Sequence, residues 1–173
     1  MKNLYLILGQ SGVGKSTLAE TLKEKYGLET VHSYTTRPAR FDGEIGHIFL
    51  TDEEFDNLPE LAAYTEFNGF RYGITKDILN KADTYVIDIA GAEMLAKRYA
   101  RPLVKIGIIL SEPELKERMK KRGDTDEMII SRLEHDKVAF KNLFSFCDIL
   151  VSGSFEPEQM ADIVYQKMKL YEN

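Results

Sequence analysis

Apolar and polar residues follow two different periods along the chain. Four short runs of apolar, largely β-branched residues predict buried strands, at 4–8, 85–89, 104–110 and 149–151. A segment with helical spacing of its apolar residues follows each run. Strands that alternate with helices pair in parallel and are covered on both faces, so the pattern predicts an α/β fold with a parallel sheet flanked by helices.

Three of the expected helices have clear signals at their ends or along one face. The helix at 17–26 repeats apolar residues every four positions and is followed by Gly27, which suits a left-handed C-terminal cap. The helix after Ser111 opens with a capping box and a proline in its first turn, and Gly123 ends it. The helix at 158–171 carries a stripe that predicts core packing, made of Ile163, Val164, Met168 and Tyr171.

The segment between the first strand and the first helix matches the pattern GxxxxGK[ST] at every fixed position. Its glycines let backbone N–H groups turn toward phosphate oxygens, and the helix adds its positive end at the same place. Lys15 can then reach the β and γ phosphates of ATP, and the Ser16 hydroxyl can ligate Mg²⁺. The segment predicts a P-loop NTPase fold whose nucleotide-binding residues are Gly9, Ser11, Gly12, Val13, Gly14, Lys15, Ser16 and Thr17.

Composition narrows the class of protein further. The 173 residues suit a single domain, and 23 basic against 28 acidic residues, without a basic cluster, argue against a nucleic-acid surface. Cys147 is the one cysteine, which excludes an internal disulfide and favours a reducing, cytoplasmic setting. The apolar run at 4–8 is too short to span a membrane. Whether the chain is a monomer or a homodimer stays open.

From residue 33 onward the sequence resembles the guanylate kinase family, with short gaps, through nearly the whole chain. Residues 33–40 resemble its S-x-T-T-R-x-x-R motif, 43–49 its GE…YxF segment, and 68–73 its G-x-x-Y-G motif. Arg118, Arg122 and Arg132 fall in a pattern similar to its L-x-x-R…RG…R lid. The resemblance implies ATP-dependent phosphoryl transfer to a small phosphorylated acceptor.

The resemblance also implies how the chain is organised. It predicts one domain over 1–173, with a core made of 1–32, 82–121 and 133–173. An acceptor-binding insertion would occupy 33–81 and a short lid 122–132. The exposed-looking acidic segment 124–127 within that lid fits a hinged element.

Roles for individual residues follow from these motifs. The resemblance places Lys15, Arg118, Arg122 and Arg132 in catalysis, and it places the acceptor on Ser33, Arg37, Arg40, His47 and Tyr72. Guanidinium forks suit phosphate, because they donate two parallel hydrogen bonds. The alternatives are also physical: arginines are ordinary in solvated loops, and cations are favoured near a helix C-terminus.

Asp88 follows the second long strand and is the candidate carboxylate for Mg²⁺, together with Ser16. Mg²⁺ keeps several water ligands, so it needs few protein groups. An aspartate at a strand end is equally typical of a helix N-cap.

The chain departs from the family where guanine is read. The positions of the base-reading glutamate, serine and aspartate hold Ala63, Ile74 and Ala90, so the resemblance implies an acceptor pocket lined by these three apolar residues. Glu66 is a possible substitute only if the segment is helical. His47 replaces a tyrosine, which also resembles ribose 1,5-bisphosphate phosphokinases. Two alternatives therefore stay open beside a guanylate kinase: a sugar-phosphate kinase, and a non-catalytic module that binds a phosphorylated protein.

Overall fold

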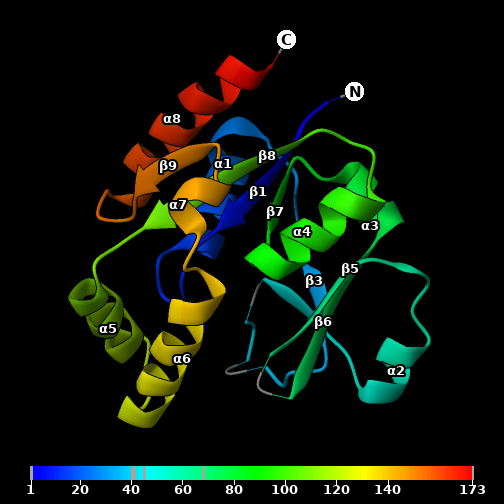
Figure 1. The fold of residues 1–173 in the computed structure, drawn as a ribbon, viewed down its shortest axis with the longest axis horizontal. Coiled ribbons are helices and arrows are strands. Elements are labelled where there is room, and N and C mark those ends of the chain that lie inside the picture. The colour runs from blue at the N-terminus through cyan, green and yellow to red at the C-terminus, as the bar shows by residue number, and fades with distance from the viewer. Residues whose placement is uncertain (1, 40–41, 45, 68, 173) are drawn as a thin grey trace.

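The central sheet has five strands, all parallel, in the order β2-β7-β1-β8-β9 (Figure 1). The computed structural model describes residues 2–39, 42–44, 46–67 and 69–172. The sheet confirms the predicted α/β fold. Its strands are β1 (Leu4–Leu8), β2 (Thr30–Val31), β7 (Thr84–Val86), β8 (Leu103–Ile109) and β9 (Ile149–Ser152).

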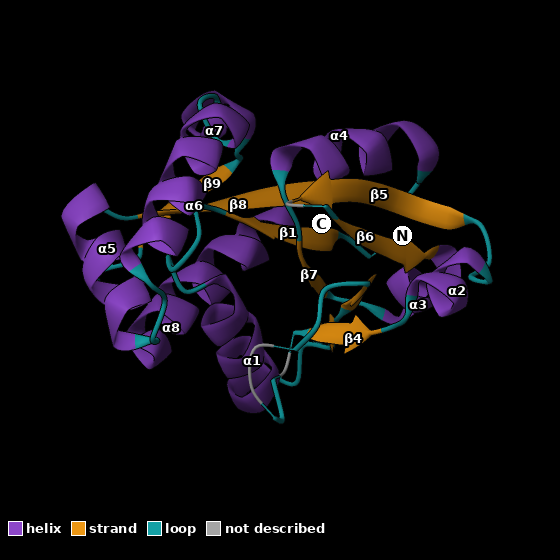
Figure 2. Ribbon diagram, turned by 90° about the horizontal axis from the view of Figure 1, so that it is seen from below, coloured by secondary structure: helices purple, strands orange, loops and turns teal. Residues whose placement is uncertain are grey.

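Helices cover both faces of this sheet (Figure 2). The helices α1 (Lys15–Tyr26) and α8 (Pro157–Met168) pack on the face to which β1 contributes Tyr5 and Ile7. The helices α4 (Ile89–Arg98) and α7 (Leu143–Phe146) pack on the opposite face, which receives the other three residues of β1. All five residues of β1 are buried for this reason, and the run of apolar residues does not alternate.

A second sheet is formed within residues 33–75, in the order β4-β3-β6-β5. Among the described residues of this sheet, β3 and β4 pair in parallel, whereas β3–β6 and β5–β6 are antiparallel. Its elements are β3 (Ser33–Thr35), β4 (His47–Phe49), β5 (Leu61–Phe67) and β6 (Phe70–Thr75), with α2 (Asp52–Asp56) before β5 and α3 (Lys76–Lys81) after β6. The strand β5 packs beside α4, which joins this sheet to the core.

Two helices, α5 (Glu112–Lys121) and α6 (Asp126–Ala139), extend from the carboxyl end of β8 (Figure 1). The predicted capping box at Ser111 is present, and Thr125 caps α6 by accepting the Met128 N–H at 3.3 Å. Residues 122–132, expected to be a lid, comprise the turn between these helices and the first half of α6. In Figure 1 they lie below the carboxyl end of β8 and to the left of β5 and β6.

Two expectations about helices and strands were wrong. The strand expected at 85–89 ends at Val86, because Asp88 already caps α4. Tyr171 is not a core residue: it lies in a short 3-10 turn (Lys169–Tyr171), is 38% exposed, and donates its hydroxyl to the Asp148 carbonyl. Within the described part of the chain, no helix combines the length and apolar character needed to cross a membrane.

Candidate active site

The segment between β1 and α1 has the backbone of a phosphate-binding loop. Gly9, Gly12 and Gly14 have φ angles of 149°, 81° and 105°, which L side chains rarely adopt. A Cβ at Gly9 would also lie 2.7 Å from the carbonyl oxygen of Ile108. The side chain of Val13 is buried in the core and anchors the loop there. The glycines and the buried Val13 side chain therefore favour this loop conformation.

The Lys15 side chain folds back over the loop. Its Nζ donates hydrogen bonds to the carbonyl oxygens of Gly9 at 2.7 Å and Gln10 at 3.0 Å. The residue keeps some solvent exposure, but its ammonium is enclosed by protein groups, and this burial lowers the pKa of Lys15 to about 8. Ser16 and Thr17 follow in the first turn of α1 and are exposed.

Four charged side chains lie close enough to change the pKa of Lys15. The carboxylates of Asp136 and Asp88 raise it, whereas the guanidinium groups of Arg122 and Arg132 add to the lowering by burial. These groups come from α6, from the β7–α4 junction and from the end of α5. The structure thus brings the predicted lysine, two predicted arginines and the predicted metal ligand to one place.

Arg118, on α5, lies against the backbone of the phosphate loop. Its Nη2 donates to the carbonyl oxygen of Gly153 at 2.7 Å, and its Nη1 donates to that of Val13 at 3.3 Å. The guanidinium therefore ties α5 to the loop and to the turn after β9. This contact gives Arg118 a structural role, and its predicted catalytic role stays a prediction.

Arg122 and Arg132 share a carboxylate. Asp124 accepts from Arg122 Nε at 3.2 Å, and its Oδ2 lies 3.6 Å from Arg132 Nε. The Asp124 side chain is only 5% exposed, so the expectation of an exposed acidic segment was wrong at this residue. Burial lowers the pKa of Arg132; Asp124 raises it, and the charges of Arg122 and Arg37 lower it further. Arg132 therefore interacts electrostatically with Lys15, at the phosphate loop, and with Arg37, beside the second sheet.

A second cationic centre is built around Arg37, just after β3. Its Nη2 and Nη1 donate to the two carboxylate oxygens of Glu44 at 2.8 and 3.2 Å, and both side chains are less than 10% exposed. Burial lowers the pKa of Arg37, but its hydrogen bonds with Glu44 and Tyr72 raise it, and the net pKa lies above its ordinary value. The guanidinium is therefore fixed in position and charged.

Three predicted acceptor residues surround this centre. His47 and Ser33 are direct partners in the β3–β4 register, and His47 Nδ1 lies 2.9 Å from Ser33 Oγ. The His47 ring meets the Tyr72 ring edge-on, with centroids 5.4 Å apart. Arg40, the fifth predicted acceptor residue, lies outside the described residues. The other four come together from β3, β4 and β6.

The Asp88 carboxylate has two hydrogen bonds of its own. Its Oδ1 accepts from the Gly91 N–H at 2.7 Å and so caps α4, and its Oδ2 accepts from Thr65 Oγ1 at 3.2 Å. The helix-cap reading of Asp88 is thus correct, and the carboxylate is also near Lys15. Among the described residues, no cluster of three or more His, Cys, Asp or Glu could hold a metal ion. Ser16 with one carboxylate fits Mg²⁺ that keeps water and phosphate ligands.

Two of the three residues at the base-reading positions are buried in the core, so the expectation that all three line the acceptor pocket was wrong for Ala63 and Ile74. Ala63 and Ile74 are direct partners on β5 and β6 and are 2% and 0% exposed, within the core beneath α4. Ala90 is exposed on the first turn of α4.

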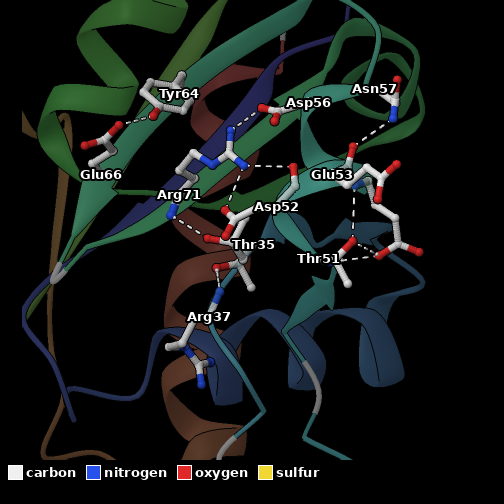
Figure 3. A network of polar contacts seen from close by, with 12 residues as sticks. Thr35, Arg37, Thr51, Asp52, Glu53, Asp56, Asn57, Tyr64, Glu66 and Arg71 are labelled. Carbon is white, nitrogen blue, oxygen red and sulfur yellow. Dashed lines mark hydrogen bonds and ion pairs between the residues drawn. The ribbon is translucent and has the colours of Figure 1, made fainter.

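Glu66 cannot replace the missing carboxylate. It lies on a strand, and neighbouring residues of a strand point to opposite faces. Thr65 faces Asp88, so Glu66 faces away, where it accepts a hydrogen bond from the Tyr64 hydroxyl (Figure 3). On that same outer face Arg71 pairs with α2, at 2.8 Å from Asp52.

Sequence reasoning also missed the buried carboxylate of Asp136. Asp136 is 4% exposed and accepts the Ser11 N–H at 2.6 Å. The two residues are 125 positions apart, so no local pattern connects them. The only sequence signal was an aspartate one helical turn after Arg132 on the same helix.

Comparisons with known proteins agree with this geometry. A family model described as "AAA domain" matches residues 6–138. The guanylate kinase of Mycoplasma genitalium is 32% identical over 168 residues, covering 88% of this chain and 70% of that protein. The ribose 1,5-bisphosphate phosphokinase of Pectobacterium parmentieri is 30% identical over 161 residues, covering 87% and 85%. The crystal structure of guanylate kinase from Anaplasma phagocytophilum has a TM-score of 0.68 and 25% identity, covering 98% of this chain and 86% of that one.

Proposed function

Because this chain belongs to the AAA domain family and, through its relatives, to the guanylate kinase-like P-loop phosphotransferases, we propose that it transfers the γ-phosphoryl group of ATP to a small phosphorylated acceptor. One observation carries the proposal. There are two cationic centres, one around Lys15 and one around Arg37, and Arg132 lies near enough to interact electrostatically with both. Such an arrangement suits a reaction in which the γ-phosphate of ATP and the phosphate of the acceptor are bound close together.

The donor phosphates bind at the loop before α1. Backbone N–H groups and the positive end of α1 attract the phosphate oxygens, and Lys15 exchanges its bonds to the Gly9 and Gln10 carbonyl oxygens for bonds to phosphate. Loose phosphoryl transfer needs alignment and positive charge more than covalent chemistry. Lys15, Arg122 and Arg132 supply that charge next to the transferred group.

Ser16 and Asp88 are the residues that would hold Mg²⁺. Bound there, the ion would neutralise charge on the β and γ phosphates. Asp88 is preorganised for this task, since the Gly91 N–H and the Thr65 hydroxyl fix its carboxylate in one orientation. A Cβ at Gly46 would lie 3.6 Å from Ser16 Oγ, so Gly46, the residue before β4, lies next to this hydroxyl.

The acceptor phosphate binds at the second centre. Arg37 offers a fixed guanidinium, and Tyr72 and His47 add donors beside it. Glu44 orients the arginine through its two-oxygen contact. Recognition at this centre rests on phosphate and not on a base.

Guanine selectivity is accordingly weak in our proposal. A site that pairs with a ligand's N–H groups can discriminate by about ten-thousandfold, and an apolar site cannot. Ala63 and Ile74 offer no such groups and are sealed in the core. This observation favours a second candidate function, in which the acceptor is a sugar phosphate and not a nucleoside monophosphate.

A coupled ADP-release assay tests the proposal. The acceptors are GMP, dGMP, AMP, CMP, UMP, dTMP and ribose 1,5-bisphosphate, with Lys15→Ala as the inactive control. We expect ADP release that depends on an acceptor, with a preference for GMP below about a thousandfold in kcat/KM. No release with any acceptor, together with weak ATP binding, would indicate a non-catalytic binding module. A larger preference for GMP would refute our account of the base pocket.

A further inference from the structure

The buried carboxylate of Asp136 is not explained by the stability of its own helix. It lies in the last turn of α6, where the negative end of the helix dipole disfavours an anion. At 4% exposure it has also lost most of its hydration, which is costly for a charged group. Something outside α6 must therefore compensate it.

The compensation comes mainly from the phosphate loop. The Asp136 Oδ2 accepts the backbone N–H of Ser11 at 2.6 Å, a short, charge-assisted hydrogen bond. Lys15, which also lies near this carboxylate, binds the carbonyl oxygen of Gln10, the residue before Ser11. Asp136 and Lys15 thus hydrogen-bond to neighbouring backbone groups of the same turn of the loop.

The other carboxylate oxygen of Asp136 contacts His135, which packs against the second sheet. Its Oδ1 lies 3.3 Å from His135 Nδ1, and the His135 ring packs on the ring of Phe67 at the end of β5, with centroids 4.2 Å apart. Arg132 lies one turn earlier on α6. One helix therefore carries a contact to the phosphate loop, a contact to β5 and a cation of the reaction centre.

We propose that Asp136 is a positioning residue, which holds the phosphate loop in its nucleotide-binding shape by accepting the Ser11 N–H. The inference rests on the proposed use of ATP. The carboxylate acts through the loop backbone and does not touch the reacting atoms. Its hydrogen bond removes from binding the cost of ordering the loop.

Two substitutions separate the hydrogen bond from the charge. Asp136→Asn keeps an oxygen that can accept the Ser11 N–H but removes the charge, whereas Asp136→Ala removes both. Glu134→Ala, an exposed acidic residue of the same helix, is the matched control. Binding of AMPPNP with Mg²⁺ is measured by isothermal titration calorimetry, which needs no acceptor, and thermal unfolding without ligand checks that each variant is folded.

We expect Asp136→Ala to raise the Kd of AMPPNP by about tenfold or more. Asp136→Asn and Glu134→Ala stay within about threefold of the wild type. An unchanged Kd in Asp136→Ala, or an equal loss in Asp136→Asn, overturns the inference. If Asp136→Ala does not fold, Asp136→Glu replaces it in the test, because it keeps the charge but displaces the carboxylate oxygens. Weaker AMPPNP binding by Asp136→Glu than by Asp136→Asn supports the proposal. The reverse order overturns it.

The same experiment distinguishes this inference from the proposed function. If the wild type binds AMPPNP and Asp136→Ala binds it equally well, only the positioning role is wrong. If the wild type does not bind AMPPNP with Mg²⁺, the proposed use of ATP is wrong, and the inference fails with it.

Discussion

Replacing Arg37 by methionine, alone and together with a change of Glu44, distinguishes the role of Arg37 in acceptor binding from its role in the stability of the fold. The guanidinium forms a two-oxygen contact with Glu44, at 2.8 and 3.2 Å, and the two side chains are 9% and 7% exposed. Methionine fills similar space but leaves the Glu44 carboxylate buried without this cation. A second variant, Arg37→Met with Glu44→Leu, removes the buried charge as well.

The expected magnitudes follow from the burial of this pair. Removing one partner of a buried ion pair costs about 3 kcal/mol or more, whereas replacing both by apolar residues is close to neutral. For a chain of this size, about 3 kcal/mol lowers Tm by about 6–12 °C. Losing charge-assisted hydrogen bonds to an acceptor phosphate raises its KM by about 10- to 100-fold.

Thermal unfolding and steady-state kinetics check both effects. We expect Arg37→Met to lower Tm and the double variant to recover most of the loss. Both variants should keep KM for ATP within about threefold of the wild type and raise KM for the acceptor by about 10- to 100-fold. Equal damage to both KM values would move Arg37 out of the acceptor site. Recovery of acceptor use in the double variant would refute the reasoning altogether.

Three further predictions concern the phosphate loop and the core. Lys15→Ala should stay folded by circular dichroism but lose phosphoryl transfer by at least about a hundredfold, or about 3 kcal/mol of transition-state stabilisation. Because the ammonium form binds phosphate and the pKa of Lys15 is about 8, kcat/KM for ATP should fall as the pH rises through about 8, and a flat profile from pH 7 to 9 would contradict this. Ala63→Glu would place a carboxylate in the apolar core, so chemical denaturation should show a loss of several kcal/mol, with no gain in GMP selectivity.

Much of the nucleotide side of the site could be predicted from the sequence, because its information is local. The glycines and Lys15 are neighbours, and a strand before them and a helix after them complete the pattern. The ends of α1 and α5 were also predictable, since Gly27 and the Ser111 capping box act within one turn.

The acceptor side could be predicted only in part. The motif containing Arg37 was visible, but its ion pair with Glu44, seven residues later in the same β3–β4 connection, and the burial of both side chains have no sequence signal of their own. Whether Ala63 faces a pocket or the core depends on α4, which lies far along the chain and covers it. The orientation of Glu66 required knowing that its segment is a strand.

The two buried aspartates escaped prediction for a related reason. Asp124 stands in an acidic stretch that is typical of a solvated turn, and its burial comes from Arg122 and Arg132. Asp136 is one of several charged residues on α6, and only the phosphate loop distinguishes it. Partners distant in sequence leave no spacing to detect.

Transfer of labelled phosphate tests the central claim most directly. The protein is incubated with Mg²⁺, with ATP that carries ¹⁸O in its γ-phosphoryl group, and with each acceptor of the ADP-release assay. The masses of the products are measured by mass spectrometry. We predict that the labelled phosphoryl group appears on the phosphate of an acceptor, with ADP as the second product, and that Lys15→Ala abolishes the transfer. Label found only in inorganic phosphate, with every acceptor unchanged, would make the protein an ATPase and contradict the account.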